Sequence, residues 1–298
     1  MRSLTFTVPP ECDGTTVGKF LRYKCQVSAR LITKQKRVEQ GITLNGEHIR
    51  TIDPIRTGDV VGLNIPDDAR PAMAAGAAAQ VAYEDEDVII LEKPIGMPVH
   101  PTRGHFDDTR ANALAAYLAR KGQTAVFRPI NRLDKDTTGL VVVCRHSHGA
   151  NMLHGHMDKT YYAVCQGVLE GEGTIDAPIR RRENAGIRRE VGEGGQRSVT
   201  HWKALCSREG MTLLEIALET GRTHQIRTHF ADVMNMPLAG DPMYGGTTEH
   251  IARQALHCGR VSFVHPVTGQ PFELHSPLPE DMMQLAPCAA YYGKKSDE

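Results

Sequence analysis

Short apolar runs separated by polar turns recur along this chain, and most of them predict strands rather than helices. Residues 87–94 and 139–145 are apolar and rich in β-branched side chains, which is typical of buried strands. The runs 160–169, 199–206 and 211–220 predict further strands. Because strands outnumber helices and do not alternate regularly with them, the pattern predicts an α+β fold around an antiparallel or mixed sheet.

Three segments predict helices. Residues 111–121 are rich in Ala and Leu, and Gly122 is expected to stop the helix that they form. A second helix is expected to begin near Thr223. A third is expected to run from Ser28, which can cap its first turn, to Gly41, which can end it.

The predicted 28–41 helix has two different sides. The side expected to pack inward carries Leu31, Ile32, Gln35 and Val38. Another side is basic and carries Arg30, Lys34 and Arg37. The Asn45-Gly46 pair lies between two strand-like runs and predicts a hairpin. A basic helix beside a small hairpin favours an RNA-binding module, although a solvated surface helix would carry the same charges.

Composition indicates a globular protein and the overall charge favours no partner: the 298 residues are 40% hydrophobic and 23% charged, with a formal net charge of +0. Residues 66–80 are rich in Pro, Ala and Gly and predict a linker between a domain at 1–65 and a larger domain at 81–290. No apolar run approaches the roughly 20 residues of a membrane span, and the first residues lack the apolar centre of a signal peptide. We therefore expect a cytoplasmic protein, and a monomer.

Neither the cysteines nor the histidines predict a metal site. The chain contains no C-x-x-C spacing. His146, His148, His154 and His156 lie close together in the sequence, but H-x-H pairs in a polar stretch do not match the usual spacing of zinc ligands. We therefore expect no bound metal.

Two polar segments carry the candidate chemistry. In residues 128–145 a polar loop with Arg132 and Asp134 leads directly into an apolar strand, so a nucleophile or base could be presented rigidly there. The alternative is an ordinary surface turn. In residues 219–230, His224 and Arg227 stand three residues apart on the predicted helix and can point the same way. The alternative is a core helix with a polar outer face.

Together, several segments resemble the RluA-type pseudouridine synthases, in the order found in that family: LEKPIGMPVHP (91–101), NRLDKDTTGLVVV (131–143), KTYYAVCQG (159–167), TGRTHQIRTHF (220–230), AGDPMYGG (239–246) and LHCGRVSFVHPVTG (256–269). The segment around S-A-R-L-I and G-I-T-L-N-G is similar to the small RNA-binding domain named for ribosomal protein S-four. The resemblance covers about residues 81–280. Two positions depart from the family pattern: Asn131 replaces the usual His, and Thr138 replaces the usual Ser.

The resemblance implies a mixed, largely antiparallel sheet with a central cleft, and isomerisation of uridine to pseudouridine in RNA without a cofactor. Asp134 matches the essential aspartate, and the resemblance implies that Arg227 pairs with it. From the guanidinium geometry we expect two parallel hydrogen bonds. Tyr161 matches the tyrosine that stacks on the base, Arg132 matches an arginine that helps to flip the nucleotide, and Ile226 would pack beside the base. We also assign His224 and Thr138 to substrate binding, and Arg30, Lys34 and Arg37 to RNA binding.

Ribosomal RNA is the favoured substrate, because the appended N-terminal domain resembles a ribosomal module, and transfer RNA is the alternative. Two other classes of protein remain open. One is an RNA-binding assembly factor whose synthase body no longer turns over. The other is a glycoside hydrolase with Asp134 and Asp136 as paired carboxylates, which would have to flank one bond. The arginine-rich stretch 180–190 predicts a mobile loop that could clamp RNA phosphates.

Overall fold

The computed structural model describes residues 2–66, 78–102 and 104–285. Most of the linker expected at 66–80 lies outside the described residues, as does the end of the larger domain at 286–290. The residues on either side of positions 67–77 form separate hydrophobic cores, a small one before this segment and a larger one after it. Among the described residues, no helix has the length and apolar character needed to cross a membrane.

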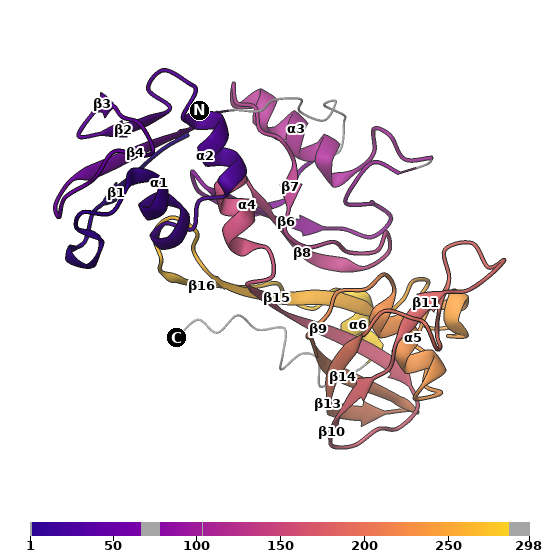
Figure 1. The fold of residues 1–298 in the computed structure, drawn as a ribbon. Coiled ribbons are helices and arrows are strands. Elements are labelled where there is room, and N and C mark those ends of the chain that lie inside the picture. Colours follow the sequence, from indigo (N-terminus) through magenta and orange to yellow (C-terminus); the bar gives the residue numbers. More distant parts are fainter. Residues whose placement is uncertain (1, 67–77, 103, 286–298) are drawn as a thin grey trace, which may run out of the picture.

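The N-terminal domain is a small antiparallel sheet with helices packed on it (Figure 1). Its elements are β1 (Arg2–Thr7), η1 (Pro10–Cys12), α1 (Val17–Lys19), the π-helical turn η2 (Phe20–Lys24), α2 (Ala29–Gln35), β2 (Ile42–Leu44), β3 (Glu47–His48) and β4 (Val60–Ile65). The strand order is β1-β4-β2-β3. Leu21 and Leu31 from the helices share one core with Leu63 from β4. The hairpin predicted at Asn45-Gly46 joins β2 to β3, and both residues have positive φ.

Helix α2 is shorter than its pattern predicts. The Ser28 hydroxyl accepts a hydrogen bond from the Leu31 amide at 3.2 Å, as expected of an N-cap. The helix ends at Gln35 rather than near Gly41, and Val38 is 45% exposed instead of packing inward. The residue in the left-handed conformation is Gln40, with φ 58°. Gly41 is needed for a different reason, because a Cβ there would lie 2.3 Å from the Gln35 carbonyl oxygen.

The larger body is built on a ten-stranded sheet. Its elements are β5 (Val81–Glu84), β6 (Val88–Lys93), α3 (Arg110–Arg120), β7 (Arg128–Pro129), β8 (Thr138–Cys144), α4 (Ser147–Leu153), β9 (Met157–Gln166), β10 (Glu172–Asp176), β11 (Ile179–Arg181), β12 (Arg189–Val191), β13 (Val199–Arg208), β14 (Met211–Leu218), α5 (Gln225–Asp232), η3 (Pro242–Tyr244), β15 (Leu256–Val264), β16 (Pro271–His275) and α6 (Glu280–Leu285). The strand order is β10-β13-β14-β9-β15-β8-β6-β5, with β16 beside β15 and β7 beside β8. The sheet is mixed and largely antiparallel, as the resemblance implies.

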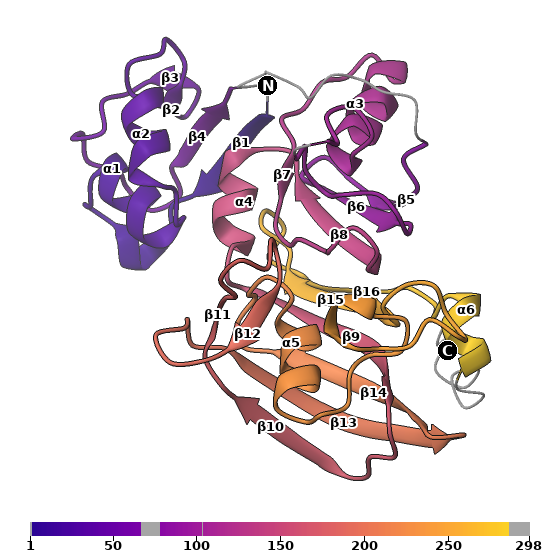
Figure 2. The same ribbon diagram turned by 90° about the vertical axis from the view of Figure 1, so that its right-hand side faces the viewer.

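The single parallel pairing within this sheet, among the described strands, joins its two halves (Figure 2). There β8 meets β15, with Thr138 beside His257 and Gly139 beside Cys258. A side chain at Gly139 would collide with the Cys258 backbone, because a Cβ would lie 2.2 Å from the carbonyl oxygen, and its φ is +111°. The polar loop with Arg132 and Asp134, expected before the strand in residues 128–145, leads into the sheet at this joint.

Strand β14 has apolar side chains on both faces of the sheet, so it does not show the alternation of apolar and polar residues that marks a half-exposed strand. Leu214 and Ile216 face the main core, and Leu213 faces a second core that contains Met282 of α6. Helices α5 and α6 contribute residues to the cores on the two faces of this strand, so side chains that would be polar on a solvent-exposed face are apolar here. Helix α5 is likewise buried over most of its surface from Gln225 to Phe230, whereas Val233, just beyond the helix, is 42% exposed.

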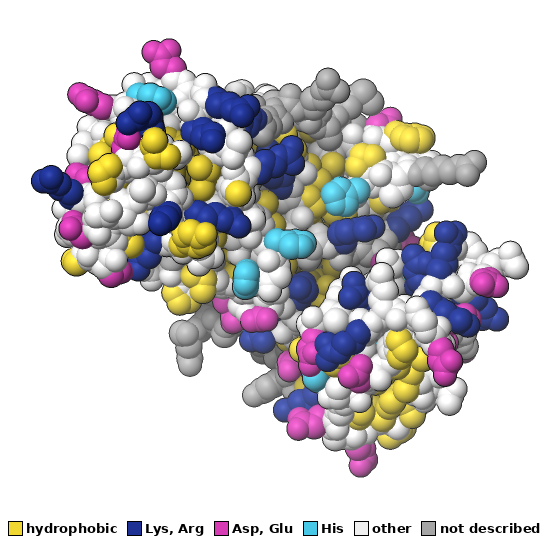
Figure 3. Space-filling view, viewed as in Figure 1, with side chains coloured by type: hydrophobic (Ala, Val, Ile, Leu, Met, Phe, Trp, Pro, Cys, Tyr) yellow, Lys and Arg dark blue, Asp and Glu magenta, His cyan; other side chains and the backbone are white. Residues whose placement is uncertain are grey.

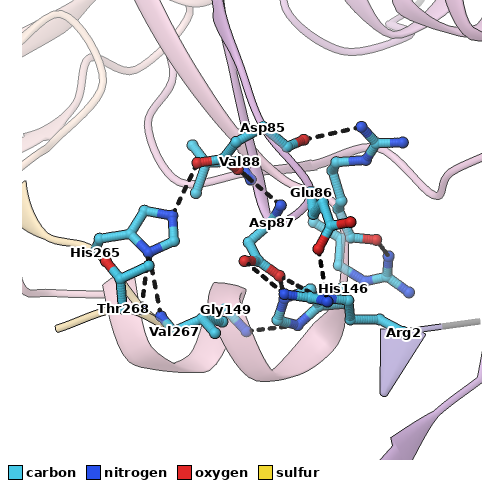
Figure 4. Close-up of polar contacts among 12 residues, drawn as sticks. Arg2, Asp85, Glu86, Asp87, Val88, His146, Gly149, His265, Val267 and Thr268 are labelled. Atoms are coloured by element: carbon cyan, nitrogen blue, oxygen red, sulfur yellow. Dashed lines mark hydrogen bonds and ion pairs between the residues drawn. The ribbon is translucent and has the colours of Figure 1, made fainter. Parts of the chain in front are cut away.

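Polar contacts join the N-terminal domain to the body (Figure 4). Arg2 of β1 donates to both oxygens of Asp87, at 2.7 and 3.2 Å, and pairs with Glu86 at 2.7 Å. His146 lies 3.0 Å from the same carboxylate. Burial alone would raise the pKa of Asp87, but the hydrogen bonds from His146 and Arg2 outweigh it and lower that pKa to about 2. The contact is therefore a buried, charge-assisted joint.

Candidate active site

The loop that carries Asp134 is tied to strand β8 by Asn131. The Asn131 amide donates to the Leu140 carbonyl and accepts from the Val142 amide, both at 2.9 Å. The Thr137 amide donates to the Asp134 carbonyl at 3.1 Å and closes the turn. Hydrogen bonds therefore hold the loop on both sides of the aspartate. The Asn131 side chain bonds the backbone of β8 much as a neighbouring strand would.

Lys93, at the end of β6, is hydrogen-bonded to the backbone of the same loop. Its ammonium donates to the carbonyl oxygens of Pro94, Met97 and Lys135, at 2.9, 2.8 and 2.6 Å. The residue is 1% exposed. Burial lowers its pKa to about 7, although the charge of nearby Asp136 opposes this shift. Lys93 was not among the residues predicted from the sequence, where the available signal was an isolated lysine at the end of an apolar strand.

Arg227 of α5 lies between two carboxylates. Its Nη1 donates to Oδ2 of Asp134 at 3.0 Å. The expected pair of parallel bonds to Asp134 is wrong, because Nε and Nη2 donate instead to the two oxygens of Asp241, at 2.6 and 2.9 Å. Asp241 is fully buried. Burial alone would lower the pKa of Arg227, but Asp241 and Asp134 together raise it, so the arginine is charged.

Asp241 was missed as a site residue, although it lies in the segment 239–246. Its signal was an acidic residue among Ala, Gly and Pro, between apolar neighbours. The same segment supplies Tyr244, whose ring lies 5.0 Å from the Arg227 guanidinium carbon. Asp241 and Tyr244 therefore hold the arginine from two directions, and Nη1 is left to contact Asp134.

A small pocket of about 60 Å³ lies over these groups, and its lining residues are Arg132, Leu133, Asp134, Thr137, Tyr161, Leu218, Arg222, His224, Gln225, Ile226, Arg227 and Leu256. Asp134 is the one carboxylate among these residues, and Asp136 is not among them. The lining thus gives no second carboxylate for a glycosidase.

Tyr161 and Ile226 form part of the apolar wall of this pocket. Tyr161, on β9, is 6% exposed, and Ile226, on α5, is 4% exposed. Burial raises the pKa of Tyr161 well above its ordinary value, so the phenol is protonated near neutral pH. Arg132 lines the same pocket and, unlike these two residues, is exposed.

Thr138 lies away from the pocket, unlike its neighbour Thr137. Its hydroxyl is hydrogen-bonded to Nδ1 of the buried His257 at 2.9 Å, across the joint between β8 and β15. The side chain therefore stabilises the joint, and its assignment to substrate binding is not supported by its position.

The expected RNA-binding side chains are exposed on the N-terminal domain: Arg30, Lys34 and Arg37. In Figure 3, Lys and Arg side chains gather on this domain and on the lobe of β11, with further basic side chains between them. The arginine-rich stretch 180–190 is a hairpin of β11 and β12 rather than the mobile loop predicted. Its backbone is anchored to the body, because the Arg189 amide donates to the Tyr244 hydroxyl and the Val191 amide donates to Asp232.

One group among the described residues could present three ligand atoms to a metal: Asp85, Asp87 and His265, with these atoms within 4.8 Å of one another. The Asp85 and Asp87 oxygens already accept hydrogen bonds from neighbouring groups, including Tyr83, Arg2 and the Val88 amide. His265 also bonds Asp85, at 3.0 Å. These contacts support a structural role at the domain joint.

The chain is similar to known RNA pseudouridine synthases along most of its length. The model of the RNA pseudouridylate synthase family matches residues 87–232. The uncharacterised RNA pseudouridine synthase YjbO of Bacillus subtilis is 36% identical over 87% of this chain and 94% of its own length. Ribosomal large subunit pseudouridine synthase D of Escherichia coli is 33% identical over 95% of this chain and 93% of its own length. The chain belongs to the RNA pseudouridine synthase family, in the RluA group that its motifs resemble.

Solved structures support the fold. The human protein described as RNA pseudouridylate synthase domain containing 4 superposes with a TM-score of 0.57, at 19% identity, over 71% of this chain and 93% of that chain. A second human protein, described as domain containing 1, gives a TM-score of 0.57 at 22% identity, over 72% and 90% of the two chains. The ten-stranded mixed sheet is thus that of the pseudouridine synthases.

Proposed function

We propose that this enzyme isomerises specific uridines to pseudouridine in structured RNA, with ribosomal RNA as the favoured substrate, through Asp134 and without a cofactor. The observation that carries the proposal is the state of the Asp134 carboxylate. Oδ2 is held by Arg227, whereas Oδ1 has no hydrogen bond within the described part of the chain. One oxygen is therefore anchored by a positive charge, in a side chain that lines the pocket.

The pocket supports a sequence of steps. A uridine inside a helix must leave the stack before an aspartate can reach its sugar, at a cost of a few kcal/mol. The exposed Arg132 lines the pocket, which supports a role in holding the flipped nucleotide. Asp134 then attacks the anomeric carbon or removes a proton from the neighbouring sugar carbon. The bond between N1 and the sugar breaks, and the released base turns against Tyr161 and Ile226. Carbon 5 then bonds to the anomeric carbon as the bond to Asp134 breaks or as the sugar carbon regains its proton, after which carbon 5 loses its proton and N1 gains one.

The substrate is inferred from the relatives and from the basic surfaces. Several relatives carry names of the form ribosomal large subunit pseudouridine synthase D. The basic residues of the N-terminal domain and of the β11–β12 hairpin give two surfaces for RNA phosphates on either side of the pocket. Transfer RNA is the competing substrate, and mapping of both RNA classes separates them.

The test is the variant Asp134→Asn. Asn is nearly isosteric but is neither a nucleophile nor a base at neutral pH, so we expect pseudouridine formation to disappear. RNA affinity should stay within about tenfold, because phosphate contacts dominate binding. Carbodiimide mapping of ribosomal and transfer RNA, from cells with each form of the protein, measures the product. Substantial pseudouridine in the variant would remove Asp134 from the mechanism.

Asp136→Asn is the matched control. Asp136 lies on the same loop but does not line the pocket, so this variant should keep its activity. A wild-type chain that binds RNA but forms no pseudouridine would favour the assembly-factor alternative.

A further inference from the structure

His224 occupies an unusual position between Tyr244 and Asp134. It precedes α5 in the left-handed conformation, with φ 58° and ψ 20°, and its side chain makes no capping hydrogen bond to the helix. A non-glycine residue in this conformation is uncommon and is held by its surroundings. The imidazole is 5% exposed, with Nδ1 2.9 Å from the Tyr244 hydroxyl and Nε2 3.8 Å from Oδ2 of Asp134. The left-handed turn is what directs the ring towards the carboxylate.

The Tyr244 hydroxyl determines which nitrogen of His224 carries a proton. A phenol has one proton to donate and two lone pairs to accept. The Arg189 amide donates to this oxygen at 2.9 Å, and the Thr228 hydroxyl donates at 3.3 Å. Both acceptor positions are therefore filled, and the phenol proton is left for Nδ1 of His224. Nδ1 is then an acceptor, so the neutral imidazole carries its hydrogen on Nε2, which faces Asp134.

The surroundings of the ring agree with a neutral imidazole. Burial lowers the pKa of His224, and Arg227 acts in the same direction, while Asp134 and Asp241 oppose it. The gap of 3.8 Å between Nε2 and Oδ2 is too long for a hydrogen bond in the free enzyme. Hydrogen bonds in active sites commonly shorten when substrate binds. Asp134 already has one N–H donor on Oδ2, and His224 is placed to supply the second.

We propose that His224 is a positioning residue for the reaction, whose tautomer is set by the Tyr244 hydroxyl and whose Nε2–H holds Oδ2 of Asp134 together with Arg227 when RNA is bound. This inference rests on the proposed function. Two donors on one oxygen fix the carboxylate plane and leave Oδ1 as the reacting oxygen. The same hydroxyl accepts from Arg189 of the arginine hairpin, so the hairpin is connected to the site through one atom.

Two substitutions of His224 separate positioning from simple packing. In His224→Asn the amide lies near the place of Nδ1, and Asn tolerates the left-handed backbone, but no donor reaches Asp134. In His224→Gln the longer side chain brings an amide donor near the place of Nε2. We expect kcat to fall about 10- to 100-fold in the Asn variant, as for the loss of a hydrogen bond to a charged group. The Gln variant should recover most of that loss, and KM for RNA should change little in both.

The tautomer is tested separately, without turnover. In protein labelled with ¹⁵N-histidine, the His224 signal is assigned by its loss in His224→Asn, and its long-range ¹⁵N–¹H pattern is recorded at pH 7. We expect a protonated Nε2 and an unprotonated Nδ1 in the wild type. In Tyr244→Phe we expect a mixture of tautomers and a lower kcat, with thermal unfolding as the control for folding.

The outcomes are distinct. A proton on Nδ1 in the wild type, full activity of His224→Asn, or equal impairment of folded Asn and Gln variants would overturn the inference while leaving the proposed function intact. A wild-type enzyme that forms no pseudouridine would overturn the proposed function and this inference with it. The expected tautomer together with recovery in the Gln variant would support it.

Discussion

The guanidinium of Arg227 serves two carboxylates at once, and this decides what a conservative change would do. Asp241 receives two hydrogen bonds and Asp134 receives one, so the arginine is fixed by the residue that does not face the pocket. Asp241 therefore fixes the plane of the guanidinium through Nε and Nη2, and Nη1 holds Asp134 in position. A lysine keeps the charge but has no planar fork to give Asp241 two parallel hydrogen bonds.

We therefore predict that Arg227→Lys lowers turnover about 100-fold or more, with little change in RNA affinity. Because buried Asp241 would lose its fork, the variant should also be less stable, by roughly 3 kcal/mol on the scale of broken buried pairs. Single-turnover kinetics and urea unfolding measure the two effects. Near-normal turnover would show that one ammonium can replace the fork.

Lys93 gives a pH-dependent prediction at the same scale. The unfolded chain keeps this ammonium protonated up to its ordinary pKa of 10.5, whereas burial lowers the pKa in the folded chain to about 7. Between these values the unfolded chain binds more protons, so the free energy of unfolding rises with pH, by at most ~1.4 kcal/mol per unit. Lys93→Met has no such proton. We expect the wild type to gain about 2 kcal/mol relative to this variant between pH 7 and 9.

Urea unfolding of both proteins across that range provides the measurement. Other titrating groups are common to the two proteins, so they cancel in the difference. Parallel curves for the wild type and Lys93→Met would show that Lys93 keeps its proton throughout.

At the scale of elements, the β11–β12 hairpin joins arginines to the site. Arg180 and Arg182 both pair with Glu190, at 2.9 and 3.7 Å, and Arg181 donates to the Gly186 carbonyl in the turn at 2.9 Å. All three arginines are exposed. The hairpin backbone is anchored at Tyr244 and Asp232, so these arginines project from a fixed base. A fixed basic arm beside the pocket is well suited to hold RNA phosphates.

We predict that Arg181→Gln with Arg182→Gln flattens the dependence of RNA affinity on salt, by about 0.7–0.9 in log–log slope for each phosphate that is no longer neutralised. The turnover of bound RNA should change little. Filter binding at several salt concentrations measures the slope. Arg208→Gln, at the C-terminal end of β13 and outside the hairpin, is the matched control and should leave the slope unchanged. If the hairpin variant has the same slope as the wild type, these arginines do not bind phosphates.

At the scale of the whole molecule, the N-terminal domain is held against the body by more than its linker. Arg2 and His146 share the Asp87 carboxylate, and the ring of His148, on α4, meets the edge of Phe6, on β1. The Asn151 side chain adds a hydrogen bond to the Gln26 carbonyl. These contacts fix the position of the small domain relative to the body.

We predict that replacing Arg30, Lys34 and Arg37 together by Gln lowers RNA affinity and flattens its salt dependence, again by about 0.7–0.9 in slope for each phosphate that these side chains neutralise. The kcat should be little changed, because the pocket is untouched. Arg50→Gln in the same domain, where Arg50 is paired with Asp53, is the control. An unchanged slope in the triple variant would mean that this basic side is only solvated.

Local pattern determined the elements that are continuous in sequence. The apolar runs predicted β6, β8, β9, β13 and β14 with small errors at their ends, and Asn45-Gly46 predicted the N-terminal hairpin. The motifs also selected Asp134, Arg227, Tyr161, Ile226, Arg132 and His224, all of which line one pocket. These signals are local, because backbone propensity and side-chain periodicity depend on neighbouring residues.

Only the tertiary structure decided which distant groups share a partner. The Asp241 carboxylate accepts two hydrogen bonds from Arg227. The Thr138 hydroxyl is hydrogen-bonded to His257, 119 residues away. The Lys93 ammonium donates to the backbone of the loop that carries Asp134. Each is a buried polar group that must find a hydrogen-bond partner, and the sequence offers many candidates for each. Packing of β8 against β15, and of α5 beside β12 and β13, selects among them, because hydrogen bonds require distances of about 3 Å that only the folded chain sets.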